Sequence, residues 1–255
     1  MEHKIMDRYI LHSGGAIGAD YEWGRQGEPF GVVSRHYWHG KRTPYGNVEI
    51  TEEEFEEGRQ HVLHANRVLH RSPEKYMDLL ARDWCQVKYA DAIYAVGYLK
   101  RDHFNRGTVE GGTGWAVQMA IDEEKPVYLF DQELEHWLNF ENGEWVGCDI
   151  PVLTRDFAGI GSRKITESGI RAIGEVYKKM REKLEFWNSR RLTKEEIRNM
   201  PEDEFWAYVN RPNPNPIHGG EIPPHFNTKE EWLEYFKDGI DANELFRRIS
   251  EEYGI

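Results

Sequence analysis

Short apolar runs alternate with amphipathic stretches along the first 186 residues of the chain. The apolar runs have the length and composition of β-strands and cover residues 8–12, 30–33, 92–96, 126–130 and 157–161. Helical patterns lie between and after them, over about 19–25, 51–64, 73–87, 115–122 and 166–186. Strands that alternate with helices predict an α/β fold of three layers, with a mainly parallel sheet covered by helices on both faces.

The segment 34–50 is predicted as a loop because it contains the turn formers Pro44, Gly46 and Asn47. Its first part, 36–44, is rich in aromatic and basic side chains and follows a strand end. We expect it either to cover a ligand pocket or to be an exposed loop that its aromatic side chains anchor. A third ligand to accompany His36 and His39 is not evident, so no metal site is predicted.

The pattern changes beyond residue 187. The segment 211–216 reads Arg-Pro-Asn-Pro-Asn-Pro, which excludes a helix or a central strand. Short helices are predicted over 193–198, 201–209, 228–237 and 241–253. We therefore expect an α/β domain over 1–186 and a helical, Pro-rich extension over 187–255. The extension is either a cap on the domain or an oligomerisation arm, and it favours a homo-oligomer.

The composition limits the classes of partner and the cellular compartment that we expect for this protein. The 255 residues carry 33 Lys and Arg against 45 Asp and Glu, a net charge of -12. This balance argues against a nucleic-acid partner and against an anionic membrane surface. The sequence has no apolar run long enough for a membrane span, and its start lacks the apolar centre of a signal peptide. With only Cys85 and Cys148, we expect reduced thiols in a cytoplasmic protein.

Three glycine-rich turns each follow an apolar strand and precede a helix. They are Ser13-Gly14-Gly15-Ala16, Gly111-Gly112-Thr113-Gly114 and Gly159-Ile160-Gly161-Ser162-Arg163. Glycine lets backbone N–H groups converge, and a helix N-terminus adds free donors and a positive dipole end. One such turn is typical of a tight connection, but three on one sheet predict a site for a phosphate or nucleotide. The chain contains neither G-x-G-x-x-G nor a Walker A motif.

The three turns resemble those of the SLOG superfamily, which includes DNA-processing protein A, LONELY GUY and YpsA-type proteins. The similarity covers about residues 8–180. It extends to Thr43-Pro44-x-Gly46-Asn47, Leu80-x-Arg82-Asp83-Trp84-x-Gln86-Val87-Lys88 and Gly114-Trp115-Ala116-Val117-Gln118-Met119-Ala120. It implies a Rossmann-like fold that binds nucleotides or nucleotide-derived ligands. In most of the superfamily the strand with the GxGSR-type turn comes first, so the resemblance implies a circular permutation here.

The resemblance does not extend to the catalytic motif of the LONELY GUY proteins, PGGxGTxxE. Gln118 stands at the place of the catalytic Glu, Trp115 at that of the Thr and Glu110 at that of the Pro. Cleavage of an N-glycosidic bond needs a carboxylate, and glutamine carries no charge. Asp20, Glu110, Asp131 and Asp91 are the other carboxylates near predicted strand ends. The catalytic residues, and whether the chain is an enzyme at all, are left open.

Candidate ligand contacts outside the turn backbones each have a structural alternative. These candidates are Asp20, Arg82, Trp115, Gln118, Asp131 and Arg163. Asp20 either contacts the ligand or caps a helix, and Trp115 either stacks on a base or fills the core. Arg82 and Arg163 either bind a phosphate or form ion pairs with acidic neighbours.

The expected function is binding of a nucleotide or nucleotide-derived signal, of the ADP-ribose or cyclic nucleotide type, without turnover. The resemblance implies this because related SLOG domains sense such signals in antiviral immunity, and the chain would act as a sensor or as a sequestering sponge. One alternative is a nucleoside-monophosphate phosphoribohydrolase or related N-glycosidase. The other is a protein-interaction or DNA-processing accessory role. No cofactor is predicted.

Overall fold

The computed structural model describes residues 9–65, 67, 76–101, 107–189, 198–199 and 201. The chain divides into two compact units, Met1–Lys183 and Leu184–Ile255, and the fold described below is that of the first. Residues 198 and 199 are helical. Of the helix predicted over 193–198 only residue 198 is described, and residue 201, the first of the helix predicted over 201–209, is not helical. The rest of that helix, those predicted over 228–237 and 241–253, and most of the predicted extension lie outside the described residues.

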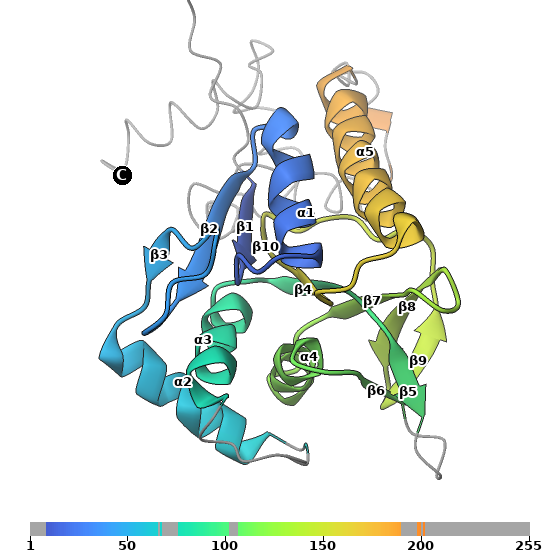
Figure 1. Ribbon diagram of the computed structural model, residues 1–255. Helices are drawn as coiled ribbons and strands as arrows, with labels where there is room; N and C mark the ends of the chain where they lie inside the picture. Colours follow the sequence, from blue (N-terminus) through green and yellow to red (C-terminus); the bar gives the residue numbers. More distant parts are fainter. Residues whose placement is uncertain are drawn as a thin grey trace, which may run out of the picture. The chain divides into compact units, whose positions relative to one another are not determined.

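An eight-stranded sheet forms the middle layer of the first unit, in the order β3-β2-β1-β10-β4-β7-β8-β9 (Figure 1). Its strands are β1 (Ile10–Ser13), β2 (Val33–Trp38), β3 (Val48–Glu49), β4 (Ala92–Gly97), β7 (Val127–Asp131), β8 (His136–Glu141), β9 (Glu144–Gly147) and β10 (Asp156–Gly161). The strands from β3 to β7 in this order are parallel, and β8 and β9 add an antiparallel edge. A separate antiparallel pair comprises β5 (Leu99–Arg101) and β6 (Gly107–Val109).

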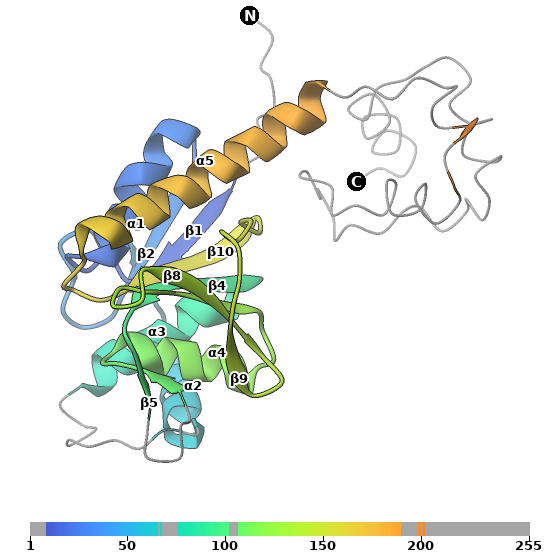
Figure 2. The ribbon, with the colours of Figure 1, turned by 90° about the vertical axis from the view of Figure 1, so that its right-hand side faces the viewer.

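Helices cover both faces of the sheet. They are α1 (Ala19–Gly27), α2 (Glu52–His64), α3 (Met77–Lys88), α4 (Thr113–Asp122) and α5 (Glu167–Ser189), and a short 3-10 helix, η1 (Glu28–Phe30), follows α1. Figures 1 and 2 show α1 and α5 on one face and α2, α3 and α4 on the other. The fold is therefore the predicted Rossmann-like α/β sandwich of three layers. No described helix combines the length and the apolar character that crossing a bilayer requires.

The order of the strands creates a switch point in the sheet. From β1 the chain passes through α1 to β2 on one side, and from β4 it passes through α4 to β7 on the other. β10 comes last in the sequence, yet it lies between β1 and β4 and pairs with both in parallel. The carboxyl ends of β1, β10 and β4 therefore meet at one edge, where ligands bind in open α/β sheets.

An aromatic cluster fills the space between the sheet and helices α1 and α5. Trp23, Tyr94, Phe157 and Tyr177 are fully buried, and their rings pack mostly edge to face. The Tyr177 hydroxyl donates to the Trp23 backbone carbonyl at 2.7 Å. The polar tip of this ring is therefore satisfied inside the core, as burial of a hydroxyl requires.

The second strand differs from its predicted position. Residues 28–30 form η1, and β2 begins only at Val33. Gly31 adopts a φ of 74°, which interrupts the apolar run that had suggested a strand. The strand then continues through His36 and Tyr37, which are buried, so part of the predicted loop 34–50 is sheet. Because β2 contains polar residues, its sequence does not show the apolar pattern of a strand, and its burial becomes clear only from contacts with neighbouring elements.

The antiparallel hairpin β8–β9 was not predicted, although the sequence carries a signal for it. Asn142 and Gly143 join the two strands with φ values of 51° and 85°. Two consecutive residues with positive φ are typical of the turn in a tight hairpin, and Asn-Gly is its strongest sequence signal. The hairpin extends the sheet beyond β7 without affecting the carboxyl edge of the parallel strands.

The helix that was predicted from a capping box begins as expected. The Thr51 hydroxyl accepts from the Glu54 N–H at 3.1 Å, and the Glu54 carboxylate accepts from the Thr51 N–H at 2.8 Å. These two bonds satisfy backbone donors at the start of α2.

Cys85 and Cys148 form no disulfide, and burial raises the pKa of the Cys85 thiol to about 12.

Gly58 sits where α2 crosses α3, and its lack of a side chain allows the close approach. A Cβ at this position would lie 2.0 Å from the Ala81 carbonyl oxygen. We expect Gly58→Ala to lower the free energy of unfolding by about 1–3 kcal/mol through overpacking, although alanine is the better helix former. Urea unfolding followed by circular dichroism measures this change.

Gly112→Ala is the matched control for Gly58→Ala. Gly112 has a φ of -62°, and a Cβ there would meet no atom within 4 Å. Its free energy of unfolding should therefore stay within about 0.5 kcal/mol of the wild-type value. Equal stability of the two variants would contradict the packing argument.

Candidate functional site

The first glycine turn follows β1 and is closely packed by polar side chains. A Cβ on Gly14 would lie 1.6 Å from Arg82 Nη1, so only glycine lets this guanidinium reach the turn backbone. Gly15 has a φ of 59°, and a Cβ there would lie 2.9 Å from His36 Cβ and 3.0 Å from Thr43 Oγ1. Both glycines are therefore required by a close approach of side chains from β2, the following loop and α3.

Four buried polar atoms in this region have no hydrogen-bond partner. They are Ser13 Oγ, His36 Nδ1, Thr43 Oγ1 and Arg82 Nη1. Ser13 is paired with His36 across β1 and β2, and the other two lie against Gly14 and Gly15. We call these four residues the first-turn cluster. Buried polar atoms almost always have partners, so four atoms without a hydrogen bond at one turn make it a candidate polar site.

Asp20 occupies the centre of the contact between the first and third turns. Its Oδ2 accepts from the Ala16 N–H at 3.4 Å, and its Oδ1 accepts from the Gly161 N–H at 3.2 Å. Burial raises the pKa of this carboxyl, while Arg82 and the N–H groups of Ala16, Gly161 and Gly14 oppose the rise. These N–H groups therefore donate to the buried carboxyl group of Asp20. Of the two predicted roles for Asp20, the geometry supports the structural one.

The third turn lies directly against the first. Gly18 has a φ of 108°, and a Cβ there would lie 2.5 Å from the Ser162 carbonyl oxygen, which accepts from the Ala19 N–H at 3.1 Å. A Cβ on Gly161 would lie 2.3 Å from the Val96 carbonyl oxygen. The Arg163 side chain is exposed. Turn backbones from β1 and β10 therefore meet closely, and the Arg163 side chain is open to solvent.

Gly159 belongs to the core and not to the turn. A Cβ there would lie 2.6 Å from Leu11 Cδ1 and 2.7 Å from Trp23 Cγ. The residue is buried within β10, where the absence of a side chain makes room for the aromatic cluster. The structure therefore gives no support to the predicted ligand contact at Gly159.

Contrary to the prediction, the second turn does not follow a strand of the main sheet, because it comes after β6 of the separate antiparallel pair. It is open at its start and braced at its end. A Cβ on Gly111 or Gly112 would meet no atom within 4 Å, and Gly111 has a φ of 71°. Thr113 begins α4, whose first N–H groups lack intrahelical acceptors. At the end of the turn, a Cβ on Gly114 would lie 2.0 Å from the Val109 carbonyl oxygen. This turn is therefore the most accessible of the three.

Arg67 holds the second turn in place. Its guanidinium donates to Thr108 Oγ1 at 2.8 Å, to the Val109 carbonyl at 2.7 Å and to the Gly111 carbonyl at 3.2 Å. It also lies 5.6 Å from the centre of the Trp115 ring. The sequence analysis did not identify Arg67, because it lies between α2 and α3 in a segment without a motif. Arg67 and Val109 are 42 residues apart in the sequence, so their contact forms only in the folded chain.

Three further candidates have structural partners. Trp115 is 6% exposed within the core, which is its predicted alternative role. Gln118 Nε2 donates to Asp122 Oδ1 at 2.9 Å on the exposed side of α4. Asp131 Oδ2 accepts from the Leu99 N–H at 2.7 Å. Asp131 Oδ1 accepts from the N–H groups of Glu133 and Leu134 at 2.8 and 3.0 Å. The geometry therefore supports structural roles for all three.

Asp83 is a buried carboxyl that the sequence analysis quoted only within a motif. Its Oδ1 lies 3.2 Å from Arg82 Nη1, without the geometry of a hydrogen bond, and accepts from Gln86 Nε2 at 2.7 Å. Burial raises the pKa of Asp83 to about 7; Arg82 opposes the rise and Asp20 adds to it. A carboxyl beside an arginine on an otherwise apolar helix face was the available sequence signal.

The loop after β2 packs onto the first turn by its backbone. The Tyr45 N–H donates to the Gly15 carbonyl at 3.4 Å, and Arg42 Nε donates to the Gly46 carbonyl at 2.6 Å. His39 stacks on Phe55 with 4.0 Å between ring centres. The predicted covering loop is therefore joined to the turn at Tyr45. No cluster of three or more His, Cys, Asp or Glu side chains suited to a metal occurs in the described ranges.

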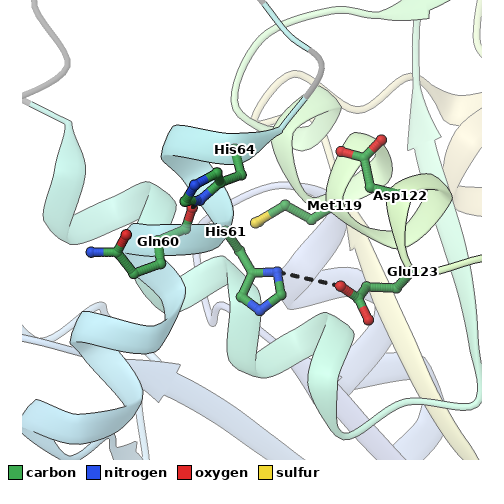
Figure 3. A pocket seen from close by; sticks show the side chains of 6 residues that line it. All are labelled: Gln60, His61, His64, Met119, Asp122 and Glu123. Carbon is green, nitrogen blue, oxygen red and sulfur yellow. Dashed lines mark hydrogen bonds and ion pairs between the residues drawn. The ribbon is translucent and has the colours of Figure 1, made fainter.

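A pocket of about 230 Å³ lies away from the glycine turns. Figure 3 shows its lining residues, Gln60, His61, His64, Met119, Asp122 and Glu123. His61 Nδ1 lies 3.4 Å from Glu123 Oε1, and the His61 ring stacks on Trp84 with 3.4 Å between centres. The pocket is formed by the last turns of α2 and α4, and α4 begins at the second glycine turn. It contains no predicted site residue.

Comparisons of the chain with protein-family models, with curated proteins and with solved structures returned no match. The functional assignment therefore depends on the site itself.

Asp83 predicts a pH-dependent stability that a neutral variant lacks. Its pKa is raised from 3.8 to about 7, so folding takes up a proton between these values. The wild-type chain should lose stability as the pH rises through this window. Asp83→Asn cannot titrate. Its free energy of unfolding, relative to that of the wild type, should therefore rise by on the order of a few kcal/mol between about pH 4 and pH 8.

The two proteins differ in the titration of Asp83 and in its coupling to Asp20, whose charge adds to the rise of the Asp83 pKa. Burial lowers the pKa of His36 from 6.5 to about 4, with Arg82 adding to the shift. His36 therefore costs stability as the pH falls through that window, the opposite sign. Because His36 is present in both proteins, its contribution cancels in the difference. Denaturant unfolding at several pH values measures this difference, and a value independent of pH would refute the assignment.

Proposed function

We propose that the chain binds a nucleotide or nucleotide-derived signalling molecule, with a phosphate held at the first-turn cluster. The observation that carries this proposal is a group of four buried polar atoms without a hydrogen bond, Ser13 Oγ, His36 Nδ1, Thr43 Oγ1 and Arg82 Nη1. Of these, Arg82 Nη1 lies 3.2 Å from Asp83 Oδ1 in an ion pair. They lie at the carboxyl end of β1, beside the switch point of the sheet. The resemblance to the SLOG superfamily supports the same class of ligand.

The chemistry of the cluster suits a phosphate. Arg82 supplies a guanidinium that is 4% exposed, and charge-assisted hydrogen bonds to phosphate are strong at buried sites. The hydroxyls of Ser13 and Thr43 are further donors. The pKa of His36 is lowered to about 4 by burial, so the ring is neutral near pH 7 and presents one N–H donor.

Binding without turnover is favoured by the partners of the nearby carboxylates. Asp20 and Asp131 accept backbone N–H groups, and Gln118 replaces the carboxylate that the LONELY GUY motif carries. A sensor or a sequestering protein needs no general acid or base. The net charge of -12 disfavours the DNA-processing alternative, and self-association through 187–255 stays a proposal about residues outside those described.

Asp83 favours an N-glycosidase as the second candidate function. Its carboxyl is buried beside Arg82, and its pKa of about 7 is suited to general acid or base catalysis near neutral pH. Turnover would then use Asp83 in place of the carboxylate that Gln118 lacks. The two functions differ in the fate of the ligand.

A nucleotide panel tests the proposal. Purified protein is incubated with AMP, ADP-ribose, NAD and cyclic ADP-ribose isomers, the thermal shift is followed, and the ligand is recovered by heating and identified by chromatography. We expect at least one ligand to raise the melting temperature and to be recovered unchanged. Recovery of free base and sugar phosphate would establish the N-glycosidase, and Asp83→Asn should then abolish turnover.

Arg82→Met tests whether the first-turn cluster holds the ligand. Removing a charged donor from a buried phosphate site costs about 1.5–3 kcal/mol, so the affinity should fall by about tenfold to a hundredfold. Arg59→Met is the matched control, because Arg59 is an exposed arginine on α2 whose guanidinium pairs with Glu56. Isothermal titration calorimetry measures both variants. Equal affinities of Arg82→Met, Arg59→Met and the wild type would exclude this cluster as the binding site.

A further inference from the structure

A pair of stacked tyrosines lies beside the first-turn cluster. Tyr21 belongs to the first turn of α1, and its N–H donates to the Ala16 carbonyl at 3.1 Å. Tyr45 belongs to the loop after β2, and its N–H donates to the Gly15 carbonyl at 3.4 Å. Their ring centres are 4.5 Å apart, with 29° between the ring planes. Both rings are therefore tied to the glycine turn through their own backbones.

The tyrosine pair leaves aromatic surface open to solvent. Tyr45 is 42% exposed, and Ile17, which lies in the same glycine turn, is 67% exposed. Stacking on Tyr21 uses one side of the Tyr45 ring, and the residue as a whole remains exposed. An aromatic ring of this kind, placed next to a polar anion site, is suited to stacking on a flat heterocycle.

Tyr45 lies close to the first-turn cluster along the chain. Thr43, a member of the first-turn cluster, precedes Tyr45 by two residues, so their Cα atoms are at most about 7 Å apart. A ligand with its phosphate at the cluster and a base one ribose away would reach the tyrosine ring. Inorganic phosphate and sugar phosphates have no group that reaches it.

We infer that Tyr45, supported by Tyr21, is the base-contacting residue of the site and makes the chain selective for nucleoside phosphates over sugar phosphates. The inference rests on the proposed function and adds the part of the ligand that the glycine turns leave undetermined. Stacking accepts any base because every base has a π-face. The site should therefore prefer nucleotides as a class and discriminate weakly among bases.

The test compares AMP with ribose 5-phosphate, which lacks only the base. Isothermal titration calorimetry is performed on the wild type, Tyr45→Ala and Tyr45→Phe. We expect Tyr45→Ala to weaken AMP binding by about tenfold, as alanine substitution does at stacked bases. Tyr45→Phe keeps the ring and should bind AMP within about twofold of the wild type. Ribose 5-phosphate should bind all three proteins equally within about twofold, because it does not reach the ring.

A merely structural role of Tyr45 would change a different quantity. If the ring only attaches the loop to α1, Tyr45→Ala should weaken both ligands together through the displaced Thr43, and the affinity ratio of AMP to ribose 5-phosphate would stay constant. That result, or unchanged AMP binding by Tyr45→Ala, would overturn the inference. The proposed function would survive either result, provided that Arg82→Met still weakens ribose 5-phosphate binding. If the wild type binds neither AMP nor ribose 5-phosphate but binds another nucleotide of the panel, the base contact as stated is refuted and the proposed function stands. If it binds no nucleotide of the panel, both are refuted.

Discussion

The carboxylate of Asp20 is the interaction on which the carboxyl edge of the sheet depends. It accepts backbone N–H groups from the turn after β1 and from the turn after β10, two segments about 140 residues apart in the chain. Gly18 and Gly161 allow these turns to approach to within backbone contact. Without a buried acceptor between them, converging N–H groups would be left unsatisfied, which is costly in the interior.

Because Asp20 accepts these hydrogen bonds, the glycine turns do not present all their N–H groups to a ligand. Converging N–H groups at a helix start are typical of a phosphate site, but here several of them already bind Asp20. The polar atoms that lack partners are instead side-chain atoms on β1, β2, the following loop and α3. The proposed phosphate site is therefore assembled mainly from side chains around Gly14 and Gly15, with Arg82 as its one cation.

The buried charges around Arg82 are unevenly balanced. Asp20 and Asp83 both lie near this single guanidinium, and burial raises the pKa of each carboxyl. An anionic ligand would add further negative charge to the same region, so its binding and the protonation of Asp83 are linked. In the proposed site, the exposed ring of Tyr45 would add an apolar contact to these charged groups.

The sequence by itself determined the α/β class, the start of α2 at its capping box and the first glycine-bearing strand–turn–helix unit, because these depend on local periodicity and on residues a few positions apart. It did not show that the second glycine turn follows β6, outside the main sheet. Only the tertiary structure decided that Gly159 belongs to the core, that Arg67 braces the second turn and that Asp20 is a buried acceptor for turn N–H groups. It also decided that β2 continues through polar residues and that Arg82 lies against Gly14. Each of these contacts joins segments that are far apart in the chain and come together only on folding, so no local sequence pattern contains them.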